Sequence, residues 1–205
     1  QKGLLADDIF YKTKYKVAAA VDARMSGFNL AAMTSGGSGN QGILTILTSY
    51  MVGKEMKIAE PIIYESIAWA HILNAYTKCF LGELSVICGC AMSAGLSSAT
   101  AIVYQQKGPD LQTMTLAVNN VIADLGGIIC DGAKPGCALK AITSVDSAIR
   151  SAFMALDGLG PTLDDGIIGN SVEESIKNLS QVTLEGMLQV DPTLLKIFCS
   201  KGKTN

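Results

Sequence analysis

Hydrophobic positions along this chain recur mostly at spacings of three and four residues, which is the period of an α-helix. Runs that alternate with a period of two are scarce, and Ala, Leu, Met, Glu and Lys dominate the long segments. This pattern predicts an all-α fold. We expect helices at about residues 4–25, 43–54, 61–79, 111–125, 137–156 and 171–188, and a short last helix that starts at Pro192.

Residues at the ends of these segments support the assignment. Pro61 suits the first position of a helix, and Asp110 after "GP" suits a helix N-cap. Ser171 and Glu174 form the S-x-x-E pattern of a capping box. The stretches 34–42, 126–136 and 157–170 carry the glycines and prolines of loops, and "SKGKTN" at the end suggests a frayed tail.

Residues 84–104 form a stretch of 21 residues without a formal charge, which is the length of a membrane span. The flanks lack an asymmetric Lys/Arg belt and aromatic residues on both sides, and the stretch is rich in Ser and Cys. These features favour a helix that is apolar all round and buried in the centre of the domain. A membrane-spanning protein is the alternative.

Composition narrows the functional classes. The chain has 205 residues, of which 49% are hydrophobic and 17% are charged, and its net charge is −2. We expect one domain over residues 1–205, with no nucleic-acid or membrane partner. The chain begins with Gln1 and shows no signal-peptide pattern, so we expect a cytoplasmic protein and a piece of something longer. The sequence does not determine the oligomeric state, and a homo-oligomer is one alternative.

Five of the six cysteines lie between residues 79 and 137 (Cys79, Cys88, Cys90, Cys130 and Cys137). There is no C-x-x-C pair and only one histidine, so a zinc ribbon and a zinc-dependent hydrolase are disfavoured. Clustered thiols favour metal or redox chemistry over disulfide staples. The alternative is a non-catalytic helical binding domain in which these thiols are small buried hydrophobic residues.

Two further features could carry chemistry. The loop "TSGGSGNQG" leads into a helix, and its amides and hydroxyls are typical of an anion-binding cradle. Its candidate substrate-binding residues are Ser35, Gly36, Gly37, Ser38, Gly39 and Asn40. His71, the single histidine, and Lys134, between the two loop cysteines, are the candidate catalytic residues; Tyr76 and Lys78 fall on other parts of the helix that carries His71.

Three motifs together, "SGGSGNQGI", "LSVICGCAMSAG" and "CDGAKPGCALK", resemble the iron–sulfur L-cysteine desulfidases. These proteins are related to the alpha chain of the iron–sulfur L-serine dehydratases. The resemblance covers essentially the whole chain and corresponds to the C-terminal, helical catalytic half of that family. It implies a 4Fe–4S cluster held by Cys90, Cys130 and Cys137, with Cys88 as the substitute for Cys90.

The resemblance also implies a reaction. L-cysteine would undergo β-elimination to pyruvate, ammonia and sulfide, and L-serine dehydration by the same chemistry is the alternative. The N-terminal half of the family, or a companion chain, is the expected partner beside the small amino-acid substrate. Because that half supplies part of the family's active site, the chain alone is expected to be incomplete.

Overall fold

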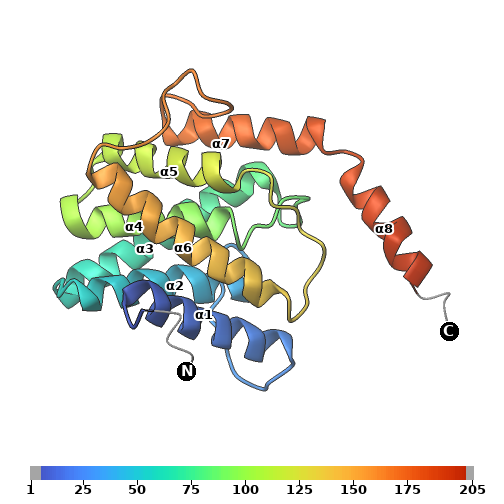
Figure 1. Cartoon of the computed structure of the whole chain (residues 1–205), viewed down its shortest axis with the longest axis horizontal. Helices are drawn as coiled ribbons and strands as arrows, with labels where there is room; N and C mark the ends of the chain where they lie inside the picture. The colour runs from blue at the N-terminus through green and yellow to red at the C-terminus, as the bar shows by residue number, and fades with distance from the viewer. Residues whose placement is uncertain (1–5, 202–205) are drawn as a thin grey trace.

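The computed structural model describes residues 6–201 and is all-α, as the periodicity predicts. In chain order the helices are α1 (Ile9–Met25), α2 (Gly39–Glu55), α3 (Glu60–Leu81), α4 (Ser93–Lys107), α5 (Leu111–Leu125), α6 (Cys137–Leu156), α7 (Val172–Gln181), the π-helical turn η1 (Val182–Gly186) and α8 (Val190–Lys201). Helices α1 to α7 pack into one body, and α8 projects from it (Figure 1).

Helix α4 is the centre of the body and contacts α2, α3, α5 and α6. It is buried on nearly all sides, and its small side chains let neighbouring helices approach closely. A Cβ atom at Gly95 would lie 3.0 Å from the hydroxyl of Ser144 on α6. The buried hydroxyls of Ser97 and Thr100 donate to carbonyls of their own helix, and Thr100 also accepts from the indole N–H of Trp69 on α3.

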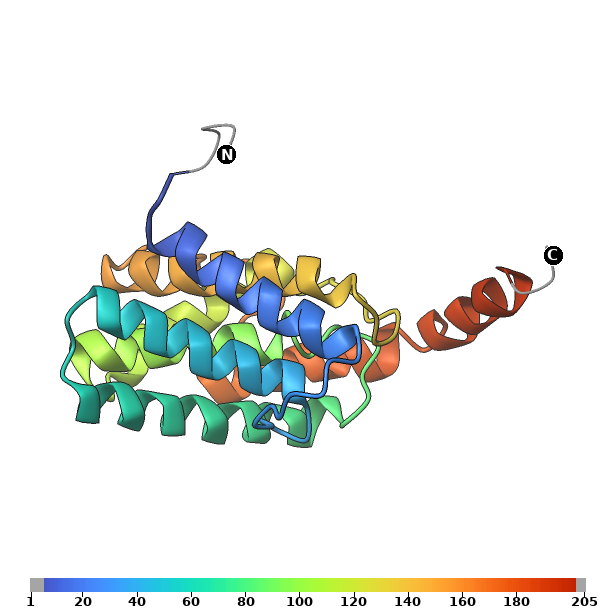
Figure 2. The same cartoon turned by 90° about the horizontal axis from the view of Figure 1, so that it is seen from below.

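Helices α1, α5, α6 and α7 surround this centre. Helix α1 covers α2 and α6, as the view from below shows (Figure 2), and α7 lies on α5. The capping interactions predicted from sequence are present, because Asp110 accepts from the amide of Thr113 and Ser171 accepts from the amide of Glu174. None of the helices in residues 6–201 is long and apolar enough to cross a membrane.

The structure corrects the predicted boundaries at four places along the chain. The first helix begins at Ile9 rather than at residue 4, because Asp8 caps it by accepting from the amide of Tyr11; residues 1–5 lie outside the described part. The second begins at Gly39 rather than at residue 43, because Ser38 is its N-cap. Near the end, α7 stops at Gln181 and the last helix starts at Val190; of the predicted tail, residues 202–205 lie outside the described part.

The fourth correction concerns the charge-free stretch 84–104. It was predicted as one helix, but α4 begins only at Ser93, and residues 84–92 form an extended and turning segment. This segment pairs with the loop before α6 through an isolated antiparallel bridge between Ile87 and Ile129. Pairing with a distant segment overrides the local helical pattern, so the "CGC" sequence lies in a turn and not on the central helix.

Candidate active site

The glycine loop is a tight turn that leads directly into α2. Ser35 and Ser38 exchange two backbone hydrogen bonds of 3.1 and 3.0 Å around Gly36 and Gly37. These glycines have φ angles of +52° and +80°, which a two-residue turn of this hand requires and which residues with a side chain adopt at a cost. The hydroxyl of Ser38 then accepts from the amide of Gln41 and caps the helix.

A buried polar network holds this turn against the body. The side-chain amide of Asn74 on α3 donates to the hydroxyl of Ser35 at 2.9 Å and to the side-chain oxygen of Gln41 at 3.0 Å. Its oxygen accepts from the hydroxyl of Ser93, the first residue of α4, at 2.7 Å. All four residues are buried, so the network fixes the turn relative to three helices.

The six predicted loop residues divide into two groups. The side chains of Ser35 and Asn40 are buried and engaged, Asn40 by accepting from Arg24 at 3.0 Å, and Gly39 is buried against Arg24. Gly36, Gly37 and Ser38 are at least partly accessible. The accessible part of the loop is therefore the turn itself, next to the N-terminus of α2.

The two cysteine-bearing segments are joined by backbone pairing. The amide of Cys88 donates to the carbonyl of Ile128 at 2.8 Å, and the amide of Cys130 donates to the carbonyl of Val86 at 2.7 Å. Because side chains alternate along extended segments, Cys88 and Cys130 lie on the same side of this pair. Residues that are 42 positions apart in the sequence thus become neighbours.

The thiols of three cysteines interact with one another. The hydrogen bond from Cys88, together with a weaker one involving Ser38, holds the pKa of Cys90 below its ordinary value despite burial. A hydrogen bond with Cys88, followed by burial, raises the pKa of Cys130. For Cys88 the bond with Cys130 lowers the pKa, but the bond with Cys90 and burial outweigh it, so the net shift is upward. Cys90 is therefore the most readily ionised of the three.

Cys137 approaches the same group from the start of α6. Its sulfur accepts from the backbone amide of Lys134 at 3.5 Å, and its thiol donates to the carbonyl of Gly132 at 3.6 Å. Gly132 has a φ of +93°, so a glycine is needed to bring that carbonyl around to the sulfur. The loop between Cys130 and Cys137 is thus shaped around the second thiol.

The glycine loop and the cysteines meet at the start of α2. The Ser38 hydroxyl contributes slightly to lowering the pKa of the Cys90 thiol. A Cβ atom at Gly89 would lie 2.5 Å from the side chain of Gln41, which shows how closely the "CGC" turn packs on the start of α2. The structure therefore brings together two motifs that the sequence analysis considered separately.

Lys134 does not stand free at this site. Its ammonium group pairs with the carboxylate of Asp131, which also pairs with Lys140. Asp131 therefore neutralises much of the positive charge that the loop carries, and Lys134 contributes to the thiol site mainly through its backbone amide. Its predicted catalytic role stays a prediction.

His71 lies on α3 three residues before Asn74. Its Nε2 atom is buried and has no hydrogen-bond partner among the described residues, and burial lowers the pKa of the imidazole. Burial thus favours the neutral ring, which is the form that can accept a proton. No contact with the thiols places His71 in the site, so its catalytic role also stays a prediction.

Three residues that the sequence analysis did not select belong to this region: Gln41, Asn74 and Lys78. Lys78 was assigned to another part of its helix, but it follows Asn74 by four residues and so lies on the same face. A Cβ atom at Gly36 would lie 3.0 Å from both the Asn74 amide nitrogen and the Lys78 Cγ. Helical spacing from Asn74 is the signal that could have identified Lys78.

The thiol donors of this region are of the type that binds iron–sulfur clusters. Within residues 6–201 no group of three or more His, Cys, Asp or Glu side chains is placed to hold a metal ion. In an iron–sulfur cluster each cysteine binds a different iron, so its thiolate ligands stand farther apart than those of one ion. Cys90, Cys130 and Cys137, beside backbone amides and lysines, offer thiolate donors and positive charge of the type such a cluster needs.

Comparisons with known proteins agree on one family. The family model of the serine dehydratase alpha chain matches residues 2–196. A UPF0597 protein of Geobacter sulfurreducens is 51% identical over 204 residues, covering 100% of this chain and 48% of that protein. A UPF0597 protein of Elusimicrobium minutum is 49% identical, covering 99% of this chain and 48% of its own length. No solved structure matches the chain.

The names of the relatives state no activity, and the family description supports a serine dehydratase-like protein rather than a cysteine desulfidase in particular. The chain also spans about half the length of the curated relatives it matches.

Proposed function

The chain belongs to the serine dehydratase alpha-chain family, and on that premise we propose that it forms the iron–sulfur part of a lyase. The reaction is β-elimination from a small L-amino acid, giving pyruvate and ammonia. The observation that carries the proposal is the close packing of the "CGC" turn on the start of α2, where an added Cβ atom at Gly89 would lie 2.5 Å from the side chain of Gln41, because it joins an anion-binding turn to a group of thiols.

Cys90, Cys130 and Cys137 are the residues that would hold a 4Fe–4S cluster. Cys88 is the nearest substitute, since its thiol interacts with both Cys90 and Cys130. Of the two residues of the "CGC" turn, Cys90 is preferred because its pKa is lowered and a thiolate is the ligand form. When bound, such a cluster supplies a Lewis acid for the leaving group on the β-carbon.

The turn 36–38 is proposed to bind the substrate carboxylate. Its accessible glycines allow a ligand to approach the backbone closely, and the N-terminus of α2 favours a negative charge. The close packing of the "CGC" turn on the start of α2 supports a carboxylate site near Cys90. The carboxylate and the β-substituent of one small amino acid would thus reach both parts of the site at once.

His71 is the proposed base for the α-proton, because burial keeps its ring neutral. Lys134 is retained as a loop-shaping residue whose charge is matched by Asp131. The half of the relatives that this chain does not cover, or a companion chain, is the proposed partner that completes the site.

L-cysteine and L-serine are the two proposed substrates. The sequence resemblance favours L-cysteine, and the family description favours L-serine. Both lose a β-substituent and a proton from the α-carbon, and both yield aminoacrylate, which hydrolyses to pyruvate and ammonia. The leaving group is sulfide in one case and hydroxide in the other.

The test is anaerobic reconstitution of the chain with iron and sulfide, alone and together with the half that its relatives carry. Iron and acid-labile sulfide are measured first, and pyruvate formation from L-serine and from L-cysteine is measured second. We expect bound iron and sulfide in both preparations and pyruvate at least in the combined one. A combined preparation that holds iron and yields no pyruvate from either amino acid would contradict the proposed reaction.

A further inference from the structure

Lys78 is a charged residue at the site to which the function above gives no role. It lies on α3 one helical turn after Asn74 and is half-buried. Its side chain runs past Gly36, where an added Cβ atom would lie 3.0 Å from the Lys78 Cγ. Its charge interacts with the thiols of Cys90 and Cys130. Lys78 therefore lies beside the glycine turn and within electrostatic range of two of the cysteines.

The other lysines near the thiols are already paired. Lys134 and Lys140 both form ion pairs with Asp131. Among the residues that the structure describes, Lys78 forms no ion pair and donates to the backbone carbonyl of Glu83. The exposed carboxylate of Glu83 attracts it only at longer range. Of these three lysines, Lys78 is thus the one that forms no ion pair with the residues that the structure describes, although the Glu83 carboxylate is the charge that acts on it most strongly.

An ammonium group has three N–H donors, and the carbonyl of Glu83 accepts from one of them. Within the described residues the other two donors have no protein acceptor, so they are available to water or to a ligand. The accessible turn beside it, Gly36 to Ser38, offers backbone and hydroxyl groups that also suit a negative ligand. The surroundings of Lys78 therefore match a small carboxylate.

We propose that Lys78 binds the α-carboxylate of the substrate, together with the turn 36–38. The proposal rests on the proposed function for the kind of ligand, a small amino acid. Lys78 then fixes the ligand by its carboxylate end, and the β-carbon is directed toward the cysteines. A charge-assisted hydrogen bond of this kind is lost when the ammonium is removed, and it contributes roughly 10- to 100-fold in affinity.

The test compares two ligands that differ only in this charge. L-alanine has the carboxylate and no leaving group, so it binds without reacting, whereas L-alaninamide carries a neutral amide instead. Binding of both is measured by titration calorimetry on the reconstituted protein, combined with the half that its relatives carry. The variants are Lys78→Met and Lys78→Arg. The control is Lys54→Met, because Lys54 lies at the end of α2 far from the glycine turn and pairs with Glu60.

We expect Lys78→Met to weaken L-alanine binding roughly 10- to 100-fold and to leave L-alaninamide binding unchanged. Lys78→Arg should restore part of the preference, and Lys54→Met should behave as the unaltered protein. Equal weakening of both ligands, or loss of iron in Lys78→Met, would overturn the proposal, because Lys78 would then support the fold or the thiolates. So would an unaltered protein that does not prefer L-alanine over L-alaninamide.

This result is separable from the proposed function. If neither L-serine nor L-cysteine yields pyruvate, the reaction is contradicted, yet binding of L-alanine that depends on Lys78 still supports the carboxylate site. If pyruvate forms and L-alanine binding does not depend on Lys78, the reaction stands and the role of Lys78 is wrong. Circular dichroism of Lys78→Arg, which keeps the charge and length, checks folding in either case.

Discussion

At the residue scale, the site depends on small differences among chemically identical side chains. Four cysteines gather at one end of the body, and the environment distinguishes them: the pKa of Cys90 is lowered, and those of Cys88 and Cys130 are raised. Cys79 and Cys199 are exposed and lie outside this group. Neighbouring thiols and one serine hydroxyl thus decide which sulfur ionises first.

A cysteine series tests this order. In anaerobically reconstituted protein, Cys90→Ser and Cys130→Ser should each lose most of the bound iron, because a serine hydroxyl is a poor replacement for a thiolate ligand. Cys199→Ser, on the exposed α8, should keep its iron and serves as the control. If Cys88→Ser loses iron and Cys90→Ser keeps it, the ligand assignment within the "CGC" turn is wrong. Iron is quantified by colorimetric analysis.

The lowered pKa of His71 should make the free energy of unfolding depend on pH. Burial lowers its pKa in the folded state from 6.5, so below that value the unfolded chain binds a proton that the folded chain does not. The free energy of unfolding should therefore fall as pH decreases from about 7 to about 5, with a slope of at most about 1.4 kcal/mol per pH unit.

The matched variant His71→Gln should show a flatter dependence over the same range. Aspartate and glutamate side chains titrate mainly at lower pH, so this window isolates the histidine. Urea denaturation at several pH values measures both proteins. Identical slopes for the two would mean that His71 is solvated in the folded protein.

At the element scale, the connections matter more to the site than the helices do. The turn 35–38, the paired segments around Ile87 and Ile129, and the loop 130–137 each bring a backbone group or a sulfur to the same place. The helices supply rigid ends for these connections: Ser38 begins α2, Ser93 begins α4 and Cys137 begins α6. The site is thus built where three helices begin.

A substitution at Gly42 tests how tightly the start of α2 is packed. In an isolated helix, Gly→Ala would stabilise by about 0.8–1.0 kcal/mol. Here an added Cβ would lie 1.9 Å from the carbonyl oxygen of Met33, which is backbone and cannot move alone. We therefore expect Gly42→Ala to destabilise the protein by about 1–3 kcal/mol.

The comparison for Gly42→Ala is Gly37→Ala, where an added Cβ meets nothing within 4 Å but φ is +80°. That substitution should cost roughly 1–2 kcal/mol from backbone strain alone. Chemical denaturation gives both values. A stabilised Gly42→Ala would show that the loop before α2 shifts freely, which would also weaken the argument for a fixed turn.

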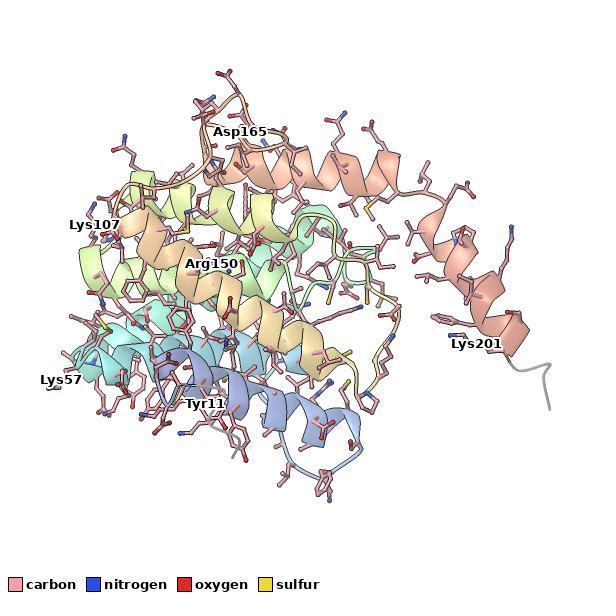
Figure 3. The ribbon with its side chains drawn as sticks, in the orientation of Figure 1. Tyr11, Lys57, Lys107, Arg150, Asp165 and Lys201 are labelled. Carbon is pink, nitrogen blue, oxygen red and sulfur yellow. The ribbon has the colours of Figure 1, made fainter. Side chains whose placement is uncertain are left out.

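At the scale of the whole molecule, the chain consists of a packed body and one projecting helix. The core lies where α4 meets its neighbours, and α7 contributes Ile176 and Leu179 to it. Helix α8 contributes no buried residue, and Figure 3 shows Lys201 at its far end, away from the body. The free energy of folding therefore comes from the segment up to α7.

Truncation separates these two parts. Deleting residues 190–205 should change the free energy of unfolding by no more than about 0.5 kcal/mol, because α8 buries no residue in the body. The longer deletion, of residues 172–205, also removes Ile176 and Leu179 from the core. It should lower the free energy of unfolding by several kcal/mol. Denaturation curves of both truncated proteins test this. A large loss in the shorter deletion would reveal contacts of α8 with the body.

Much of this architecture is readable from local sequence. The helices at 111–125 and 137–156 have the predicted bounds, because Asp110 caps one, Gly126 follows it, and an apolar stripe runs along each. The turn at Gly36 and Gly37 was recognisable as a loop because only glycine adopts such φ angles readily. The cysteine spacing predicted thiols from one buried helix and one loop, whereas Cys88 and Cys90 lie in the segment before α4 and not on a helix.

Other features depend on contacts between residues far apart in the chain, and local pattern carries no information about them. The segment 84–92 is extended because it pairs with residues 128–130, although its composition suits a helix. Lys78 and Asn74 belong to the site because α3 packs against the turn at 35–38.

The sequence by itself therefore determined the helical class, most helix ends and the chemical types at the site. Capping groups, glycine conformation and hydrophobic period act over a few residues, and they can be read from neighbours in the chain. Only the tertiary structure decided which thiols approach one another, which nearby lysine forms no ion pair with the described residues, and that the "CGC" turn packs against the start of α2. These depend on how helices pack, and packing energy is shared among residues that are distant in sequence.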